Sequence, residues 1–356
     1  MQRWIMENKL LTVIVPAYNV EKYLEECLDS LVNQTVQDHF VIIVDDGSKD
    51  STPEICDRYV EQYPELFYCI HQENKGLGAA RNAGMQHVKT PYFTCLDSDD
   101  WWDLNFVAEL KKELSLFPNE KIDLIYTLPT IYDTVRNVYY DWYDKDVFFN
   151  VFYAGNRLVS VCEKPELYNL EYNANRRIYA TEFAKRINLH FDEGVKWEDV
   201  YPHFYMTYHA KKCLGLGNVG FNYRTNTSTQ ITATSGRDRL DIIPAFIKIV
   251  QLMITEKMSR SERKIIFARI FDFIRWCIQS SNYAVRKELM QEVHKVMKAM
   301  PKHYVKEYFK DTPSRKEKLF IMVLYSPLLQ KLYIDYLVKD KVTVKIKQLG
   351  GLIRRV

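Results

Sequence analysis

Short apolar runs alternate with helix-like segments over the first 105 residues of the chain. The runs at 11–15, 40–44, 66–70 and 92–96 predict buried strands. Helices are predicted at 21–32, after the Ser51-Thr52-Pro53 cap, and at 77–87. Strands that alternate with helices predict an α/β fold with a mostly parallel sheet covered on both faces.

Each predicted strand ends in polar residues, and the carboxyl ends of parallel strands are where ligands bind. The four loops concerned are Pro16-Ala17-Tyr18-Asn19, Asp45-Asp46-Gly47-Ser48, His71-Gln72-Glu73-Asn74-Lys75-Gly76 and Asp97-Ser98-Asp99-Asp100. Acids, amides and one lysine are therefore expected along one edge of the sheet.

The pattern is weaker after residue 105. Residues 106–175 are rich in Tyr and Trp and could form short strands, whereas 241–310 have a helical pattern. We expect a catalytic domain at 1–240, with halves at 1–105 and 106–240, and a basic, mostly helical region at 241–356.

Composition and charge narrow the class of protein. With 47% hydrophobic and 27% charged residues, the 356-residue chain can bury a core. Its seven scattered Cys include no Cys-x-x-Cys pair, which argues against a disulfide framework or zinc ribbon and suits a reducing cytosol. Residues 241–356 hold 24 Lys and Arg against 11 Asp and Glu, a net of +13, which leaves −10 for residues 1–240. The basic region suits an anionic surface such as a membrane or nucleic acid.

No convincing signal peptide or apolar run of membrane-spanning length occurs in the sequence. We therefore expect a cytoplasmic protein that is soluble or peripheral on the inner face of the cell membrane.

The strongest chemical signal is Asp97-Ser98-Asp99-Asp100 at a strand end. Carboxylates spaced by one residue can share a hard divalent cation with a diphosphate. The alternative is a helix cap with acids in the first turn. The preceding buried strand and a second acidic pair favour the metal.

Three other sets of residues could contribute to a site. Asp46 can accept hydrogen bonds from a ribose or base, or it belongs to a tight turn, with Ser51 capping the next helix. Asp199, in Trp197-Glu198-Asp199, could be a general base or an ordinary helix start. Arg224 and the hydroxyls after it suit a diphosphate or a solvated loop.

The glycines of Gly76-Leu77-Gly78-Ala79-Ala80-Arg81-Asn82-Ala83-Gly84 resemble a dinucleotide fingerprint only weakly. That fingerprint belongs after the first strand, where this chain has no glycine. Close packing of helix and sheet is the better explanation. The misplaced glycines and the acidic strand ends also argue against a dehydrogenase or a nucleotidyltransferase.

Taken together, these residues resemble an inverting family 2 glycosyltransferase of the GT-A fold. The matching segments are TVIVPAYNVEKYLEECLDSLVNQT, VIIVDDGSKDST, HQENKGLGAARNAGM and YFTCLDSDDWW, with HFDEGVKWEDVYPHF similar to the family's acceptor half. A departure occurs at Asn175-Arg176-Arg177-Ile178-Tyr179, where many members have Asn-Lys-Leu-Tyr. Nothing after about residue 240 matches a family motif.

The resemblance implies a role for each matching position. The residues that would bind the nucleotide sugar are Pro16, Ala17, Tyr18, Asp46, Lys75, Arg81, Asp97, Asp100 and Arg224. Asp99, with Asp97, would bind Mn²⁺ or Mg²⁺. Asp199 would be the catalytic base, with Glu198 and Trp197 on the acceptor side.

The implied reaction is transfer of a sugar from a UDP-sugar to a hydroxyl of a glycan acceptor that is lipid-linked, in bacterial surface-polysaccharide synthesis. The alternative is a catalytically inactive sugar-nucleotide-binding scaffold of a polysaccharide assembly complex. Retention of the Asp residues argues against the scaffold. No nucleic-acid partner is expected, although a basic nucleic-acid binder stays the competing interpretation of the C-terminal third.

The tail from Ser326-Pro327 predicts a capped amphipathic helix, with Leu329, Leu332, Tyr333, Tyr336 and Leu337 on one face. Cations follow at Lys331, Lys339, Lys341, Lys345, Lys347, Arg354 and Arg355. Such a helix can lie in a membrane interface or pack its apolar face on the catalytic domain.

Overall fold

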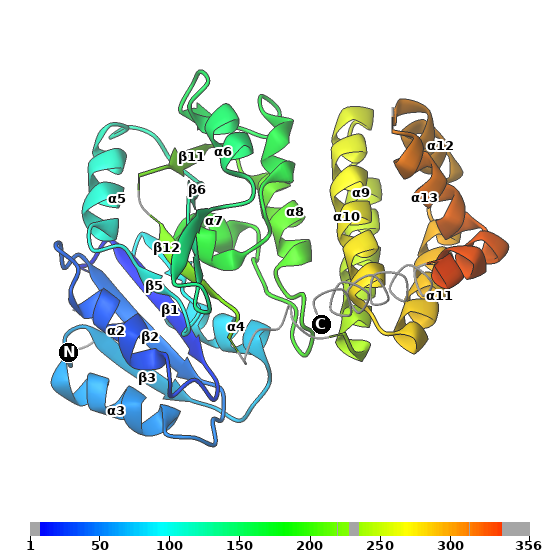
Figure 1. Cartoon of the computed structure of the whole chain (residues 1–356). Coiled ribbons are helices and arrows are strands. Elements are labelled where there is room, and N and C mark those ends of the chain that lie inside the picture. The colour runs from blue at the N-terminus through cyan, green and yellow to red at the C-terminus, as the bar shows by residue number, and fades with distance from the viewer. Residues whose placement is uncertain (1–7, 219, 228–234, 313, 337–356) are drawn as a thin grey trace, which may run out of the picture. The chain divides into compact units, whose positions relative to one another are not determined.

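The computed structural model describes residues 8–218, 220–227, 235–312 and 314–336. These residues form two compact units, which divide between Ile231 and Thr232. The first unit carries both β-sheets, and the second is helical (Figure 1).

The main sheet has eight strands in the order β3-β2-β1-β4-β10-β6-β11-β9. Strands β3, β2, β1 and β4 run parallel, and β10 is antiparallel to both of its neighbours. The strand bounds are β1 Leu11–Ala17, β2 His39–Asp45, β3 Phe67–His71, β4 Tyr92–Cys95, β6 Leu124–Thr127, β9 Leu158–Val159, β10 Arg177–Ala180 and β11 Cys213–Leu216. Every residue of β1 and β2 is buried, as expected for strands covered on both faces.

Helices of the first unit connect these strands. They are α2 Leu24–Val32, α3 Thr52–Gln62, α4 Leu77–His87, α5 Phe106–Ser115, α6 Lys145–Phe152, α7 Thr181–Arg186 and α8 Val200–His209, with short 3₁₀ turns at Pro165–Asn169 and Ala174–Arg176. Helix α4 packs on β1 through Gly84, where a Cβ would lie 2.5 Å from a methyl carbon of Ile14. The expected close packing of helix and sheet at this glycine is confirmed.

A second sheet of four strands has the order β5-β12-β7-β8. Its strands are β5 Trp101–Trp102, β12 Phe221–Thr225, β7 Thr130–Asp133 and β8 Val138–Asp141. Strand β5 begins directly after the acidic loop that follows β4. The second sheet therefore joins the Asp-rich strand end to residues more than 100 positions later.

The expected α/β architecture with a mostly parallel sheet is confirmed, and all four early strands and three helices form. One local expectation is wrong. Ser51 precedes α3, but its side chain makes no capping hydrogen bond. Asp50 and Glu21 instead accept hydrogen bonds from the backbone N–H groups of Thr52 and Ser51, at 3.0 and 2.9 Å. These carboxylates hold the N–H groups of Ser51 and Thr52, and Pro53 lacks one of the N–H groups to which a serine cap would bond.

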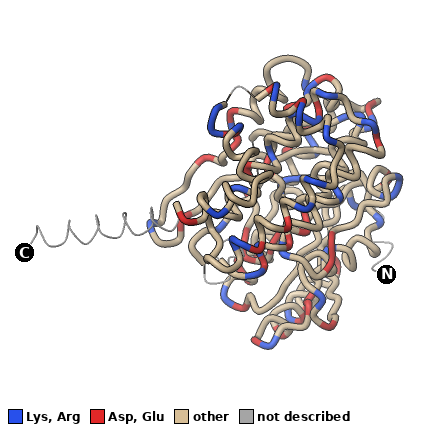
Figure 2. The backbone as a smooth tube through the Cα atoms, turned by 90° about the vertical axis from the view of Figure 1, so that its right-hand side faces the viewer, with Lys and Arg blue, Asp and Glu red and all other residues tan. Residues whose placement is uncertain are grey.

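The second unit contains α9 Ile242–Thr255, α10 Arg260–Ser280, α11 Tyr283–Ala299, α12 Lys302–Asp311 and α13 Arg315–Tyr325, after a 3₁₀ turn at Arg237–Asp241. The expected helical C-terminal region is confirmed in its described part. Lys and Arg are interspersed with Asp and Glu along the described chain (Figure 2). No helix in the described part of the chain is both long and apolar enough to cross a bilayer.

The last helical segment, residues 327–336, does not bury the apolar face named from the sequence. Ser326 does cap it, because its hydroxyl accepts a hydrogen bond from the N–H of Leu329. Gln330 and Ile334 are buried, whereas Leu328, Leu332 and Tyr336 are more than half exposed. The polar Gln330 can be buried because its amide donates to the carbonyls of Met290 and Leu324, at 3.2 and 3.1 Å. Leu337 and the cations beyond it lie outside the described residues.

Candidate active site

The acidic loop after β4 lies at the carboxyl edge of the main sheet. Leu96 still pairs with β1 through a backbone hydrogen bond to Ile14, and Asp97 begins the loop. The N–H of Asp100 donates to the carbonyl of Asp97 at 3.0 Å and closes a turn. The loop therefore begins on a rigid strand, and its carboxylates project from a fixed backbone.

Arg81 of α4 links two acidic segments that are far apart in the sequence. Its guanidinium donates to Asp97 at 2.8 Å and to Glu198. The arginine is 1% exposed, and both of its terminal nitrogens are engaged. The residue was expected on the nucleotide-sugar side, and in the structure it holds Asp97 against the segment before α8.

A glycine permits this junction. A Cβ on Gly78 would lie 2.0 Å from the carbonyl oxygen of Asp192 and 3.3 Å from the Cβ of Glu198. Any larger residue at Gly78 would push the 192–198 segment away from α4. The segment that carries Glu198 and Asp199 therefore approaches the acidic loop only because this helix position has no side chain.

Asp99 and Asp100 share a buried acidic environment. Burial, together with the nearby Asp97, raises the pKa of Asp99 to about 6. Burial and the charge of Asp99 also raise the pKa of Asp100, although its Oδ1 accepts a hydrogen bond from the N–H of Arg224 at 2.9 Å. Carboxylates that repel one another in this way gain free energy from a nearby cation.

Asp199 lies at the N-cap position of α8 and makes no side-chain capping hydrogen bond. Trp197 and Glu198 are buried, whereas Asp199 is partly exposed. Burial, followed by the charge of Glu198, raises the pKa of Asp199. A carboxylate with a raised pKa is a stronger base than an ordinary aspartate. Glu198, expected on the acceptor side, bonds to Arg81 instead.

Hydrogen bonds hold the Arg224 side chain of β12 next to the acidic loop. Its Nε donates to the carbonyl of Asp99 at 2.8 Å, and its Nη2 donates to Glu26 at 2.6 Å. Its guanidinium carbon lies 4.5 Å from the ring centroid of Trp101, a cation–π contact. These contacts place its charge beside the loop, where it lowers the pKa values of Asp99 and Asp100 against the stronger effect of burial.

Asp46 organises the loop after β3. Its carboxylate accepts hydrogen bonds from the side chain of Gln72 and from the backbone N–H groups of Lys75 and Gly76, at 2.7, 2.9 and 2.7 Å. Gly47, with φ at +73°, turns the chain next to this loop. The buried carboxylate thus fixes the backbone of Lys75 while the Lys75 side chain stays exposed.

The end of β1 completes this edge of the sheet. Pro16 and Ala17 are buried and pair with Val44 and Asp45 of β2, and the Tyr18 side chain is about half exposed. The carbonyl of Ala17 accepts a hydrogen bond from the N–H of Asp46 at 2.9 Å. The structure therefore brings the predicted residues of three strand ends to one edge.

Two residues that the sequence analysis did not select support the acidic loop. Glu26 of α2 pairs with Arg224, and the amide of Asn175 donates to Asp100 at 3.4 Å. Asn175 lies at the start of the Asn-Arg-Arg-Ile-Tyr segment that departs from the resembled family. No local pattern marks Glu26, because its partner is 198 positions away in the sequence.

The residues present fit a divalent cation in chemistry. Asp97 and Asp99 supply carboxylate oxygens, the ligands that Mg²⁺ and Mn²⁺ favour, and a cation would offset the burial and the Asp97 charge that raise the pKa of Asp99. Within the described ranges, no three His, Cys, Asp or Glu side chains converge as a complete protein-made metal site. An ion here would need ligands from a bound diphosphate as well.

Comparisons with known proteins agree with this geometry. The family described as "Glycosyl transferase family 2" matches residues 12–145. "Glycosyltransferase GlyA" of Streptococcus pneumoniae is 44% identical over 110 residues, which cover 31% of this chain and 16% of that protein. "Uncharacterized glycosyltransferase EpsJ" of Bacillus subtilis is 30% identical over 202 residues, which cover 54% of each chain. The chain thus spans between about a sixth and just over half of the length of these relatives.

Solved structures share the fold at low sequence identity. Staphylococcus aureus TarS 1–349 in complex with UDP-GlcNAc superposes with a TM-score of 0.69 and 18% identity, covering 92% of this chain and 88% of that one. The mannosyltransferase PcManGT of Pyrobaculum calidifontis, in complex with GDP-Man and Mn²⁺, superposes with a TM-score of 0.51 and 16% identity, covering 93% of this chain and 86% of that one. Residues 12–145 thus match glycosyl transferase family 2, and the chain has the expected GT-A fold.

Proposed function

We propose that this chain is a metal-dependent, inverting glycosyltransferase that moves a sugar from a UDP-sugar to a hydroxyl of a glycan acceptor. The proposal places the reaction in the synthesis of a bacterial surface polysaccharide or teichoic acid. Support comes from the relatives, which include "Minor teichoic acid biosynthesis protein GgaA" of Bacillus subtilis, 30% identical over 200 residues. The TarS complex with UDP-GlcNAc supports a UDP-sugar as donor.

One observation carries the proposal more than any other. Arg81 bonds to both Asp97 and Glu198, so the acidic loop and the residue next to Asp199 are tied to the same side chain. A metal-binding carboxylate and a general base must both lie close to the reacting sugar, the first at the diphosphate and the second at the acceptor. The Arg81 bridge supports this division of roles.

Asp99 and Asp97 would hold the Mn²⁺ or Mg²⁺ ion. When bound, the ion would neutralise charge on the departing diphosphate as a Lewis acid. Arg224, fixed beside Asp99 through its hydrogen bond to the Asp99 carbonyl, adds positive charge next to the same loop. Asp100, which is buried and bonded to the backbone of Arg224, keeps the loop and β12 together.

Asp199 would remove the proton from the acceptor hydroxyl as the oxygen attacks the anomeric carbon. Its raised pKa increases its basicity, and its side chain is not used to cap α8. The leaving diphosphate and the attacking oxygen lie on opposite faces of the sugar, so a single displacement inverts the anomeric centre. An α-linked UDP-sugar would then give a β-linkage.

Nucleotide binding is assigned to the three neighbouring strand ends. Tyr18 would contact the base, and Asp46 would fix the base or ribose while it holds the loop from Gln72 to Gly76. Lys75, with an exposed side chain on a fixed backbone, would reach the diphosphate.

We further propose that the acceptor is lipid-linked and that the second unit contacts the inner face of the cell membrane. The net charge of +13 over residues 241–356 supports attraction to anionic lipid. The exposed Leu328, Leu332 and Tyr336 supply apolar contacts on the last described helix.

The test is UDP release from a panel of UDP-sugars, measured with Mn²⁺, with Mg²⁺ and in excess EDTA, each with and without lipid-linked glycan extract. We expect metal-dependent release from one donor, accelerated by acceptor. UDP-sugar binding without any release would contradict the enzyme and favour a sugar-nucleotide-binding scaffold.

A further inference from the structure

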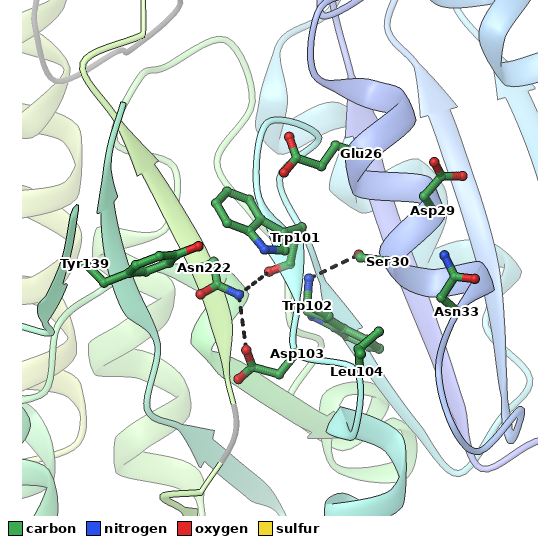
Figure 3. Close-up of a pocket in the computed structure, with 10 residues that line it drawn as sticks. All are labelled: Glu26, Asp29, Ser30, Asn33, Trp101, Trp102, Asp103, Leu104, Tyr139 and Asn222. Atoms are coloured by element: carbon green, nitrogen blue, oxygen red, sulfur yellow. Dashed lines mark hydrogen bonds between the residues drawn. The ribbon is translucent and has the colours of Figure 1, made fainter. Parts of the chain in front are cut away.

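A pocket of about 510 Å³ lies between α2 and the second sheet, and no step of the proposed reaction uses it (Figure 3). One wall is formed by Glu26, Asp29 and Ser30 of α2 and by Asn33 at its C-cap, and their spacing of three and four residues puts them on one face of that helix. The opposite wall comes from β5, β8 and β12, through Trp101, Tyr139 and Asn222. The pocket therefore has a polar helical wall and a largely aromatic sheet wall.

Strand pairing explains the aromatic wall. Trp101 pairs with Asn222, Arg224 pairs with Tyr132, and Tyr132 pairs with Tyr139, so these side chains lie on the same face of the second sheet. The ring centroids of Trp101 and Tyr132 are 5.4 Å apart, and those of Tyr132 and Tyr139 are 4.9 Å apart. Trp101 and Tyr132 meet edge to face and Tyr132 and Tyr139 are tilted, so the three rings form a connected aromatic wall that ends at the exposed Tyr139.

The charges of the lining select the kind of ligand. Three of the ten lining residues are carboxylates, Glu26, Asp29 and Asp103, and none is Lys or Arg. Glu26 is paired with Arg224, so the net negative charge of the lining comes from Asp29 and Asp103, and it disfavours phosphates and nucleotides. Carboxylate and amide oxygens accept hydrogen bonds from hydroxyl groups, and the negative faces of aromatic rings attract polarised C–H groups. Hydroxyls at the edge and C–H groups on the faces are the two features of a neutral pyranose ring.

The pocket also adjoins the proposed reaction site. Trp101 follows Asp100 directly, and Glu26 holds the guanidinium that bonds to the Asp99 carbonyl. A glycan bound here would contact Glu26 and Trp101, both of which contact Arg224.

We propose that this pocket is a subsite for uncharged sugar residues of the acceptor glycan, separate from the donor site. The proposal rests on the proposed function for the identity of the glycan as acceptor. In this proposal, Tyr139 and Asn33, which lie on opposite walls, both contact the bound neutral saccharide.

The experiment uses the full chain without donor or metal. Tryptophan fluorescence is titrated with neutral tetrasaccharides of glucose, N-acetylglucosamine, galactose and mannose, and separately with poly(glycerol phosphate). We expect at least one neutral tetrasaccharide to bind and poly(glycerol phosphate) not to compete with it. Tyr139→Ala should raise the Kd about fivefold, as expected for loss of one aromatic contact, and Asn33→Ala should raise it as well.

Tyr140→Ala is the matched control, because Tyr140 is the next residue on β8, is also exposed, and points to the opposite face of the strand. Its Kd should stay within about twofold of wild type, the scatter of a neutral surface substitution. Failure of all four tetrasaccharides to bind, preference for poly(glycerol phosphate), or equal weakening by Tyr140→Ala overturns the subsite. UDP release by the wild-type chain is measured with lipid-linked glycan extract and without these tetrasaccharides, so failure of the proposed enzyme is read from that assay independently.

Discussion

The carboxylate of Asp100 accepts a hydrogen bond from the backbone N–H of Arg224 at 2.9 Å, across 124 positions of sequence. The bond joins the acidic loop after β4 to the central strand pair of the second sheet. Since the Arg224 side chain also donates to the Asp99 carbonyl, the two segments hold each other in register. The geometry of the Asp97–Asp100 loop therefore depends on a strand near the end of the first unit.

The first prediction concerns the metal. Asp99→Asn should abolish sugar transfer and weaken Mn²⁺ binding while the chain stays folded, because a carboxylate ligand and its charge are lost. The measurements are UDP release and calorimetric Mn²⁺ titration in the presence of UDP. Asp57→Asn, at an exposed acidic side chain on α3, is the matched control and should leave both unchanged. Full activity of Asp99→Asn, or undiminished wild-type turnover in EDTA, would rule out the assignment.

The second prediction concerns the base. Asp199→Asn should lower kcat by roughly 10²–10⁴, the usual cost of losing a general base, with little change in UDP-sugar affinity. Because the pKa of Asp199 is raised, the acid limb of the wild-type pH–rate profile should lie above the usual carboxylate range. Parallel collapse of UDP-sugar binding would instead show that Asp199 acts on the donor side.

The third prediction concerns Arg81. Arg81→Met leaves the buried Glu198 without its partner, and breaking a buried ion pair in this way costs about 3–5 kcal/mol of unfolding free energy. Urea unfolding measures the loss. Arg186→Met removes a half-exposed arginine from its pair with Asp123 and should cost about 1 kcal/mol or less.

The double variant Arg81→Met with Glu198→Gln separates the cost of the unpaired Glu198 charge from the cost of lost side-chain packing. Removing the unpaired charge should recover part of the lost stability, because a neutral amide is cheaper to bury than a carboxylate. A double variant no more stable than Arg81→Met would mean that side-chain packing, and not the ion pair, sets the cost.

The fourth prediction concerns His71 on β3, whose ring bonds to Asp45 at 2.9 Å and Asp57 at 3.1 Å. The hydrogen bond to Asp45 is the main cause that raises the pKa of His71 to about 9. The folded chain therefore binds this proton more tightly than the unfolded chain, whose histidine pKa is about 6.5. The resulting stability is fully present below pH 6.5 and is lost as the pH rises through 9.

Urea unfolding of wild type and His71→Gln at pH 6, 7.5 and 9.5 tests this linkage. Wild type should be more stable than His71→Gln at pH 6, and the difference in unfolding free energy between the two chains should shrink toward pH 9.5. A difference that stays constant over this range would show that the histidine is not held protonated by the two aspartates.

The fifth prediction concerns membrane contact. Replacing both Leu328 and Leu332 by Glu should reduce co-sedimentation with anionic liposomes, because exposed apolar groups are lost and negative charge is added. Leu116→Glu, at an exposed leucine after α5 in the first unit, is the control and should bind like wild type. Equal binding by all three chains, or none by any of them, would contradict attachment through this helix.

The sequence by itself determined the early strands, the helices between them and the polar strand ends, because these features depend on local periodicity. The bounds of α4 and the acidic loop after β4 followed from residues that are neighbours in the chain. Sequence could not determine the contacts of Arg81 and Arg224, because their partners lie 117 and up to 198 positions away. Only tertiary packing turned Arg81 toward two carboxylates and brought Glu26 to the acidic loop. It also decided which face of residues 327–336 is buried, because the amide of Gln330 finds carbonyls on other helices that no pattern within its own helix reveals.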